Sequence, residues 1–127
     1  NISSEGPCGD CSSCSRIFFS QHPDVQIVTK KIEAKYVGIQ DLMDIQRNAI
    51  LKSFEGGYRI FIFPEIGLLT TEASNALLKL LEEPPDEVLF LLVTNQQTRI
   101  HSTIVSRCQV IEFTHLSLAL IEKTIRP

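Results

Sequence analysis

The chain lacks several features that would assign it to a common functional class. No apolar run approaches the roughly 18 residues that indicate a membrane span. Residues 1–6 have neither the basic start nor the apolar core of a signal peptide. A net charge of −3 gives no whole-domain electrostatic case for binding DNA. We therefore expect a cytoplasmic protein with no membrane partner.

Two further absences concern the start of the chain. Residue 1 is not an initiator methionine, so we expect an excerpt that begins within a domain. No G-x-x-x-x-G-K-[ST] loop, the segment that cradles nucleotide phosphates, is present. Because such a loop could precede residue 1, its absence alone decides nothing. The 127 residues fit one domain, and an apolar share of 43% suffices for an ordinary core.

Three of the four cysteines, Cys8, Cys11 and Cys14, lie close together at C-x-x-C-x-x-C spacing. Such crowding suits a metal in a reducing cytosol better than a disulfide framework. Structural zinc takes four ligands, of which this triplet supplies three, and His22 is a possible substitute for the fourth. The alternatives are reduced free thiols or a redox pair.

Strand-like and helix-like patterns alternate along the chain. Residues 1–14 are expected to form a loop, with a helical turn over 15–20. Apolar or β-branched runs predict strands near residues 25–28, 59–63, 88–93 and 110–113. Helical spacing predicts helices over 39–54, over 73–82 with Thr70 or Thr71 as its cap, and from 116 to 125. This alternation predicts a parallel sheet with helices on both faces.

Two blocks carry the most specific signal. Residues 73–85, ASNALLKLLEEPP, form an amphipathic helix pattern that two prolines end. Residues 103–108, TIVSRC, follow one apolar strand and form a predicted loop that presents a single arginine. Together these blocks resemble the bacterial DNA polymerase III clamp-loader subunits, the gamma/tau and delta-prime family of AAA+ proteins. The resemblance extends from residue 8 to residue 113.

The resemblance implies an α/β fold: a truncated AAA+ (P-loop NTPase-like) parallel sheet flanked by helices, lacking the strand before the phosphate loop. Residues 1–20 would form a Cys-rich zinc-binding module, residues 21–115 the sheet and helices, and residues 116–127 the start of the next helix. It also implies one structural zinc ion held by Cys8, Cys11, Cys14 and a cysteine upstream of residue 1.

The resemblance further assigns a role to the Ser106-Arg107-Cys108 segment. Arg107 would reach the phosphates of ATP bound to a neighbouring subunit, so ATP is expected only in the neighbours. A planar, permanently charged guanidinium suits this task because it makes forked hydrogen bonds to phosphate oxygens. Arg107 is therefore the catalytic candidate, acting in trans, and Cys108 is expected to be a buried structural thiol.

The strand over 59–63 ends unlike that of an active AAA+ ATPase, where Asp-Glu orients magnesium and activates water. Here Pro64 occupies the metal position, and Glu65 lacks its partner acid. Pro64 also ends a core strand, and under both interpretations the metal ligand is missing. Thr94 and Asn95 match the sensor-1 region, where we expect local backbone hydrogen bonds rather than nucleotide sensing.

Four polar residues of the second predicted helix are further candidates. Glu82 and Glu83 lie at its negative dipole end, where acids are disfavoured. Either function or an interface requires them, or both are solvated at little cost. By resemblance, Asn75 and Lys79 face a subunit interface or DNA, although one lysine is thin support for a phosphate contact.

The leading hypothesis is a non-hydrolysing, delta-prime-like subunit in a hetero-oligomeric ring with gamma/tau and delta subunits. It would help to load the sliding clamp onto primed DNA. No intrinsic active site is expected in this chain, although it would be a component of the DNA-directed DNA polymerase (nucleotidyltransferase) holoenzyme. The alternatives are an ATP-hydrolysing gamma/tau-type subunit and an unrelated zinc-binding regulatory module.

Overall fold

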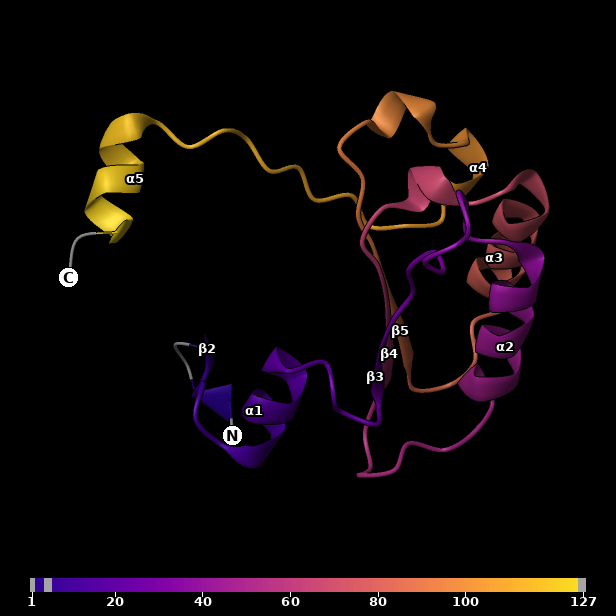
Figure 1. Cartoon of the computed structure of the whole chain (residues 1–127), viewed down its shortest axis with the longest axis horizontal. Coiled ribbons are helices and arrows are strands. Elements are labelled where there is room, and N and C mark those ends of the chain that lie inside the picture. Colours follow the sequence, from indigo (N-terminus) through magenta and orange to yellow (C-terminus); the bar gives the residue numbers. More distant parts are fainter. Residues whose placement is uncertain (1, 4–5, 126–127) are drawn as a thin grey trace.

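A parallel three-stranded sheet organises the chain (Figure 1). The structure is a computed structural model that describes residues 2–3 and 6–125. Residues 1, 4 and 5 of the predicted zinc module and residues 126 and 127 of the predicted C-terminal segment lie outside the described residues. Strands β3 (Val25–Ile27), β4 (Arg59–Phe63) and β5 (Val88–Leu92) pair in the order β3-β4-β5. Helix α2 (Ile39–Ala49) joins β3 to β4, and α3 (Thr71–Glu82) joins β4 to β5. The predicted parallel sheet with flanking helices is confirmed.

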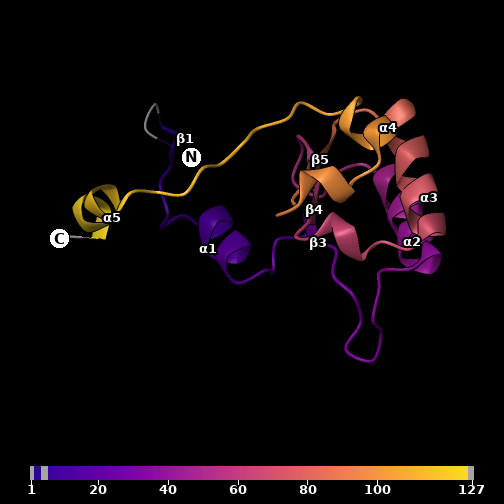
Figure 2. The same cartoon turned by 90° about the horizontal axis from the view of Figure 1, so that it is seen from above.

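Helices α2 and α3 lie side by side against one face of this sheet (Figures 1 and 2). Phe61 and Phe63 of β4 are buried there with Leu42, Ile45 and Leu77 of the two helices. On the opposite face, Ile27, Leu89 and Leu91 are 42–44% exposed. The expectation of helices on both faces is therefore wrong for the part of the chain that the structure describes.

Helix α3 forms as its sequence predicts. The Thr70 side chain accepts a hydrogen bond from the Ala73 backbone N–H at 3.2 Å and caps the first turn. Apolar residues at helical spacing face the core, namely Ala73, Ala76, Leu77, Leu80 and, partly buried, Leu81. The helix ends at Glu82, before the two prolines.

Helix α2 is shorter than its apolar pattern predicts. It ends at Ala49 rather than continuing to residue 54. The backbone N–H groups of Phe54 and Glu55 donate instead to the buried Asp24 carboxylate, at 2.7 and 3.1 Å. Because these bonds need an extended loop beside β3, they replace the helical hydrogen bonds that the pattern favours.

The predicted strand over 110–113 does not form. Val110, Ile111 and Phe113 are 49%, 69% and 93% exposed and have no regular structure. An apolar run becomes a strand only where another strand offers its backbone, and this segment runs away from the sheet (Figure 1). The predicted last helix does form, as α5 (Leu118–Ile125), which lies apart from the sheet in both views.

The N-terminal segment has more structure than the expected loop. Strands β1 (Ile2–Ser3) and β2 (Gly6–Pro7) pair antiparallel, and α1 (Ser12–Phe18) follows them. The helix starts three residues before the predicted turn because Cys11 caps its first turn. Four short elements complete the described chain: η1 (Ile66–Leu68), η2 (Gln97–Arg99), α4 (Ser102–Val105), and the Val37–Leu69 bridge.

Candidate functional site

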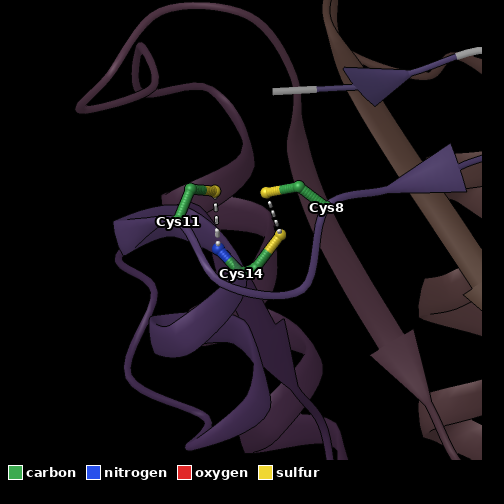
Figure 3. A group of neighbouring side chains, drawn as sticks. All are labelled: Cys8, Cys11 and Cys14. Atoms are coloured by element: carbon green, nitrogen blue, oxygen red, sulfur yellow. Dashed lines mark hydrogen bonds between the residues drawn. The ribbon is translucent and has the colours of Figure 1, made fainter.

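Three cysteine side chains converge where the N-terminal hairpin leads into α1 (Figure 3). The sulfur atoms of Cys8, Cys11 and Cys14 all lie within 4.8 Å of one another. The Cys8 and Cys14 sulfurs are 3.8 Å apart, and the Cys14 backbone N–H donates to the Cys11 sulfur at 3.4 Å. Since Cys11 is also the N-cap of α1, the cluster and the helix start are one local structure.

The hydrogen bonds of this cluster change the acidity of its thiols. The Cys14 backbone N–H, followed by the Cys8 and Cys14 side chains, lowers the pKa of Cys11 to about 6. The Gly9 backbone lowers the pKa of Cys14, but the side-chain bond to Cys11 and desolvation raise it on balance. The thiolate is the metal-binding form of cysteine, so the cluster already favours one thiolate at neutral pH.

The cluster fits three corners of a tetrahedral zinc site. Zinc–sulfur bonds of about 2.3 Å place two thiolate ligands about 3.8 Å apart. The Cys8–Cys14 sulfur separation is 3.8 Å. Within the described residues the group contains these three ligands, so a fourth donor is needed to complete it.

The thiol acidities give a pH-dependent prediction for metal-free protein. Cys11 is expected to react with iodoacetamide as a thiolate with a midpoint near pH 6, because its pKa is lowered to about 6. Burial raises the pKa of Cys108, so its alkylation should begin only in more alkaline solution. Peptide mapping by mass spectrometry over pH 5–9 measures both midpoints. Equal midpoints would contradict the hydrogen-bonded cluster.

His22 belongs to a second cluster and is not placed as the fourth cysteine-site ligand. Its Nδ1 accepts from the Asp24 backbone N–H at 3.1 Å, and its Nε2 lies 3.0 Å from Glu55 Oε2. Arg16 of α1 pairs with the same carboxylate at 2.5 Å, and this guanidinium lowers the pKa of Glu55. Both ring nitrogens of His22 are thus engaged away from the cysteines.

The carboxyl ends of β4 and β5 bring a second set of predicted residues to one edge of the sheet. Pro64 is exposed directly after β4. The Glu65 carboxylate accepts from the Gly67 backbone N–H at 2.8 Å and caps η1. On the neighbouring strand end, Thr94 Oγ1 accepts from the Gln96 backbone N–H at 3.1 Å, and Asn95 is exposed. Glu65 and Thr94 therefore bond to nearby backbone.

Arg107 and Glu82, which lie in the two most specific sequence blocks, form an ion pair. The Arg107 Nη2 atom is 3.2 Å from Glu82 Oε1, and the two side chains are 44% and 43% exposed. Arg107 thus offsets one of the acids at the negative end of α3. The pair orients the guanidinium but leaves much of it accessible, as an arginine that contacts another molecule needs to be.

The segment before Arg107 is helical, contrary to the predicted loop. Helix α4 covers residues 102–105, and the Ser106 hydroxyl donates to the Thr103 carbonyl at 3.0 Å. Ile104 is buried, which anchors the turn that carries Arg107. Cys108 is only partly buried, so its predicted burial is correct in direction and too strong in degree.

The other polar candidates of α3 are solvent-accessible. Asn75 and Lys79 are both exposed, as expected for the polar face. Glu83 is the exposed C-cap, and its backbone N–H donates to the Lys79 carbonyl at 3.2 Å. Of the four candidates near the end of α3, Glu82 is the one that pairs with Arg107 in the described part of the chain.

Sequence reasoning missed two buried charged residues, Asp24 and Arg59, which are 5% and 7% exposed. Asp24 accepts two loop N–H groups, as described above. Arg59 begins β4, and its Nε and Nη1 atoms are buried without a hydrogen-bond partner among the described residues. The available signal was a basic residue opening an otherwise apolar strand.

The chain matches one protein family over most of its length. Residues 1–117 match the family described as DNA polymerase III, delta subunit. The chain is 35% identical to DNA polymerase III subunit delta' of Bacillus subtilis, over 91% of this chain and 35% of that protein. It is 34% identical to subunit delta' of Yersinia pestis, over 82% of this chain and 31% of that protein.

Relatives of the gamma/tau kind match as well. Subunit tau of Bacillus subtilis is 33% identical, over 87% of this chain and 19% of that protein. A crystal structure of a DNA polymerase III gamma subunit-related protein from Thermotoga maritima superposes with a TM-score of 0.69 at 25% identity. That match covers 79% of this chain and 33% of the other. The chain thus spans about a third or less of each relative.

No helix in the described part of the chain is long and apolar enough to cross a membrane.

Proposed function

Because the chain belongs to the DNA polymerase III, delta subunit family, we propose that it is part of a non-hydrolysing, delta-prime-like clamp-loader subunit. Its relatives include both delta' and gamma/tau subunits at similar identity, so the choice between them depends on individual residues. In this proposal the subunit joins gamma/tau and delta subunits in a ring. The ring loads the sliding clamp onto primed DNA and forms part of the DNA-directed DNA polymerase holoenzyme.

Pro64 is the observation that carries the choice of a non-hydrolysing subunit. Hydrolysis at an AAA+ site needs an acid that orients magnesium and a second acid or water-positioning group. Proline at the carboxyl end of β4 has no side-chain oxygen to offer a metal, and the Glu65 carboxylate caps η1. A gamma/tau-type ATPase, the alternative, would need both groups on this strand end.

Arg107 is the residue that we expect to act on nucleotide, in the neighbouring subunit. Its ion pair with Glu82 orients the guanidinium at the end of α3, where 44% of the side chain stays exposed. There it would donate forked hydrogen bonds to phosphate oxygens and offset the charge that develops during hydrolysis. Asn75 and Lys79, on the exposed side of the same helix, are proposed to face the ring interface or DNA.

The cysteine cluster is proposed to hold structural zinc through Cys8, Cys11 and Cys14, with a fourth cysteine before residue 1. Bound zinc would supply a cross-link and no catalysis, because a closed thiolate site leaves no water to activate.

The proposed organisation of the chain has three parts. Residues 1–20 would form the zinc module, residues 21–115 a partial AAA+ core and residues 116–127 the start of a further helix. Within the core, Thr94 and Asn95 are proposed to stabilise local backbone.

Assembly with other clamp-loader subunits tests this function. The whole protein, mixed with gamma/tau and delta subunits of the same organism, is expected to elute with them as one complex in size-exclusion chromatography. An unrelated zinc-binding regulatory module would elute alone under the same conditions. Failure to enter the complex, with each subunit shown to be folded by circular dichroism, would contradict the proposed function.

A further inference from the structure

Helix α1 of the N-terminal module, here residues 6–19, is not held to the sheet by buried apolar side chains. The helix buries no residue, and its large apolar side chains Ile17, Phe18 and Phe19 are 48%, 82% and 63% exposed. In both views it lies beside the sheet, on the side away from α2 and α3 (Figures 1 and 2). Because apolar burial does not fix the helix, its position depends on the connecting chain and on polar contacts.

The Glu55 carboxylate makes a polar contact between this module and the core. Its Oε1 atom is 2.5 Å from Nη1 of Arg16 in α1, and its Oε2 atom is 3.0 Å from Nε2 of His22. The Glu55 backbone N–H donates to the Asp24 carboxylate at 3.1 Å, and the Asp24 backbone N–H donates to His22 Nδ1 at 3.1 Å. Glu55, His22 and Asp24 thus form a closed ring of hydrogen bonds, to which Arg16 is attached.

This ring does not have the properties of a cation site, although the ligand atoms of His22, Asp24 and Glu55 lie within 4.8 Å of one another. A backbone N–H can only donate, so His22 Nδ1 accepts, and the proton of the neutral imidazole is on Nε2. That proton faces Glu55, and the ring keeps no lone pair for a metal. The positive charge of Arg16 also disfavours a cation at the same carboxylate.

The backbones on both sides of the Arg16–Glu55 ion pair are held in place. The backbone N–H groups of Ser20 and Gln21 donate to carbonyls in the last turn of α1 at 3.0 and 2.7 Å, and Ser20 has a left-handed φ of 56°. This C-cap pattern gives the chain one direction as it leaves α1. On the other side, Asp24 binds the Glu55 backbone. An ion pair between prepositioned groups loses less conformational entropy, so it contributes more than a typical exposed pair.

We propose that the Arg16–Glu55 ion pair sets the orientation of the N-terminal module relative to the sheet, and that the module turns about the linker to β3 when this pair is lost. Because the module carries the three clustered cysteines, the pair also fixes where that cluster lies. The two side chains are 32% and 37% exposed, so added salt weakens the pair and frees the module. This inference depends on neither zinc, nucleotide nor a partner subunit.

Residual dipolar couplings of backbone amides measure this orientation in the whole protein under reducing conditions. In wild-type protein at low salt, the couplings of α1 should fit the alignment tensor of the sheet. Glu55→Gln removes the charge but keeps the backbone N–H that Asp24 binds, so the loop should keep its fold. In this variant the α1 couplings should fall to about half of their wild-type values or less, because a turning helix averages its couplings. Addition of about 1 M NaCl to the wild-type protein should lower them similarly.

Further variants identify the pair. Arg16→Gln should lower the α1 couplings as much as Glu55→Gln, and the double variant should lower them no further, because each single change already removes the interaction. Asp44→Asn, which removes the charge of an exposed ion pair within α2, is the control and should leave the α1 couplings unchanged.

Three results would overturn the proposal: wild-type α1 couplings that do not fit the tensor of the sheet, unchanged couplings in Glu55→Gln and Arg16→Gln, or an equal fall in Asp44→Asn. Amide hydrogen exchange separates turning from unfolding of α1. Protection of its amides should persist in the variants, and loss of that protection would show that the pair stabilises the helix itself and that the assigned role is wrong.

Discussion

Replacing Arg107 by alanine is expected to slow ATP hydrolysis at the neighbouring site of a reconstituted clamp loader by about a thousandfold. The guanidinium would no longer offset the charge that develops on the transferred phosphoryl group. Turnover of the whole ring should fall by the contribution of that one site, and clamp loading should slow with it. The measurement is DNA- and clamp-stimulated ATP turnover in complexes that differ only at this residue.

Arg47→Ala is the matched control for this prediction. Arg47 is also an exposed arginine in an ion pair, with Asp44 three residues earlier, but it lies on α2. Exposed ion pairs contribute little to stability, so both variants should unfold at nearly the wild-type denaturant concentration. If the intact complex with Arg107→Ala hydrolyses ATP as fast as the complex with Arg47→Ala, the role in trans is wrong.

Substitution of Cys11 by serine should reduce the zinc content of the whole protein from about one ion per molecule to nearly none. Zinc sites of this class need four ligands, and the neutral hydroxyl is a poor substitute for the thiolate that this cluster favours. The start of α1 should persist in this variant, because Cys11 is the N-cap of that helix and serine is itself a preferred N-cap residue. Elemental analysis of protein purified under reducing conditions gives the stoichiometry, and hydrogen exchange reports the helix.

Cys108→Ser is the control, because Cys108 lies in the turn that carries Arg107 and outside the cysteine cluster. It should keep one zinc ion per molecule. Since the sheet and its helices pack around a separate core, the Cys11 variant should keep its cooperative unfolding. A wild-type protein without stoichiometric zinc, or equal loss in both variants, would contradict the cysteine assignment.

Local patterns in the sequence predicted the parts of this fold whose contacts are local. Helix α3 follows its pattern from the Thr70 cap to Glu82, because capping and helical spacing involve residues at most four positions apart. The three cysteines are also near in sequence, so their convergence could be predicted from their spacing. In both cases the contacts that stabilise the observed conformation are made between residues that are close in sequence.

The sequence predictions fail where the local structure depends on residues that are far away in the sequence. Helix α2 ends early because Asp24, about thirty positions away, accepts N–H groups of the following loop. The run at 110–113 has a strand pattern but no strand beside it. The Arg107–Glu82 pair links two blocks separated by a strand, so neither block alone could reveal it. Arg59 lies on the sheet face that α2 and α3 cover, so its burial depends on residues outside its own strand.

The most direct test of the central claim is ATP turnover by the whole protein on its own, compared with a gamma/tau subunit of the same organism. A non-hydrolysing subunit with Pro64 at the metal position predicts no turnover above that of a Glu65→Gln variant, while the gamma/tau subunit hydrolyses ATP. Wild-type turnover that the Glu65→Gln variant abolishes would contradict the account and show a hydrolytic subunit of the gamma/tau type.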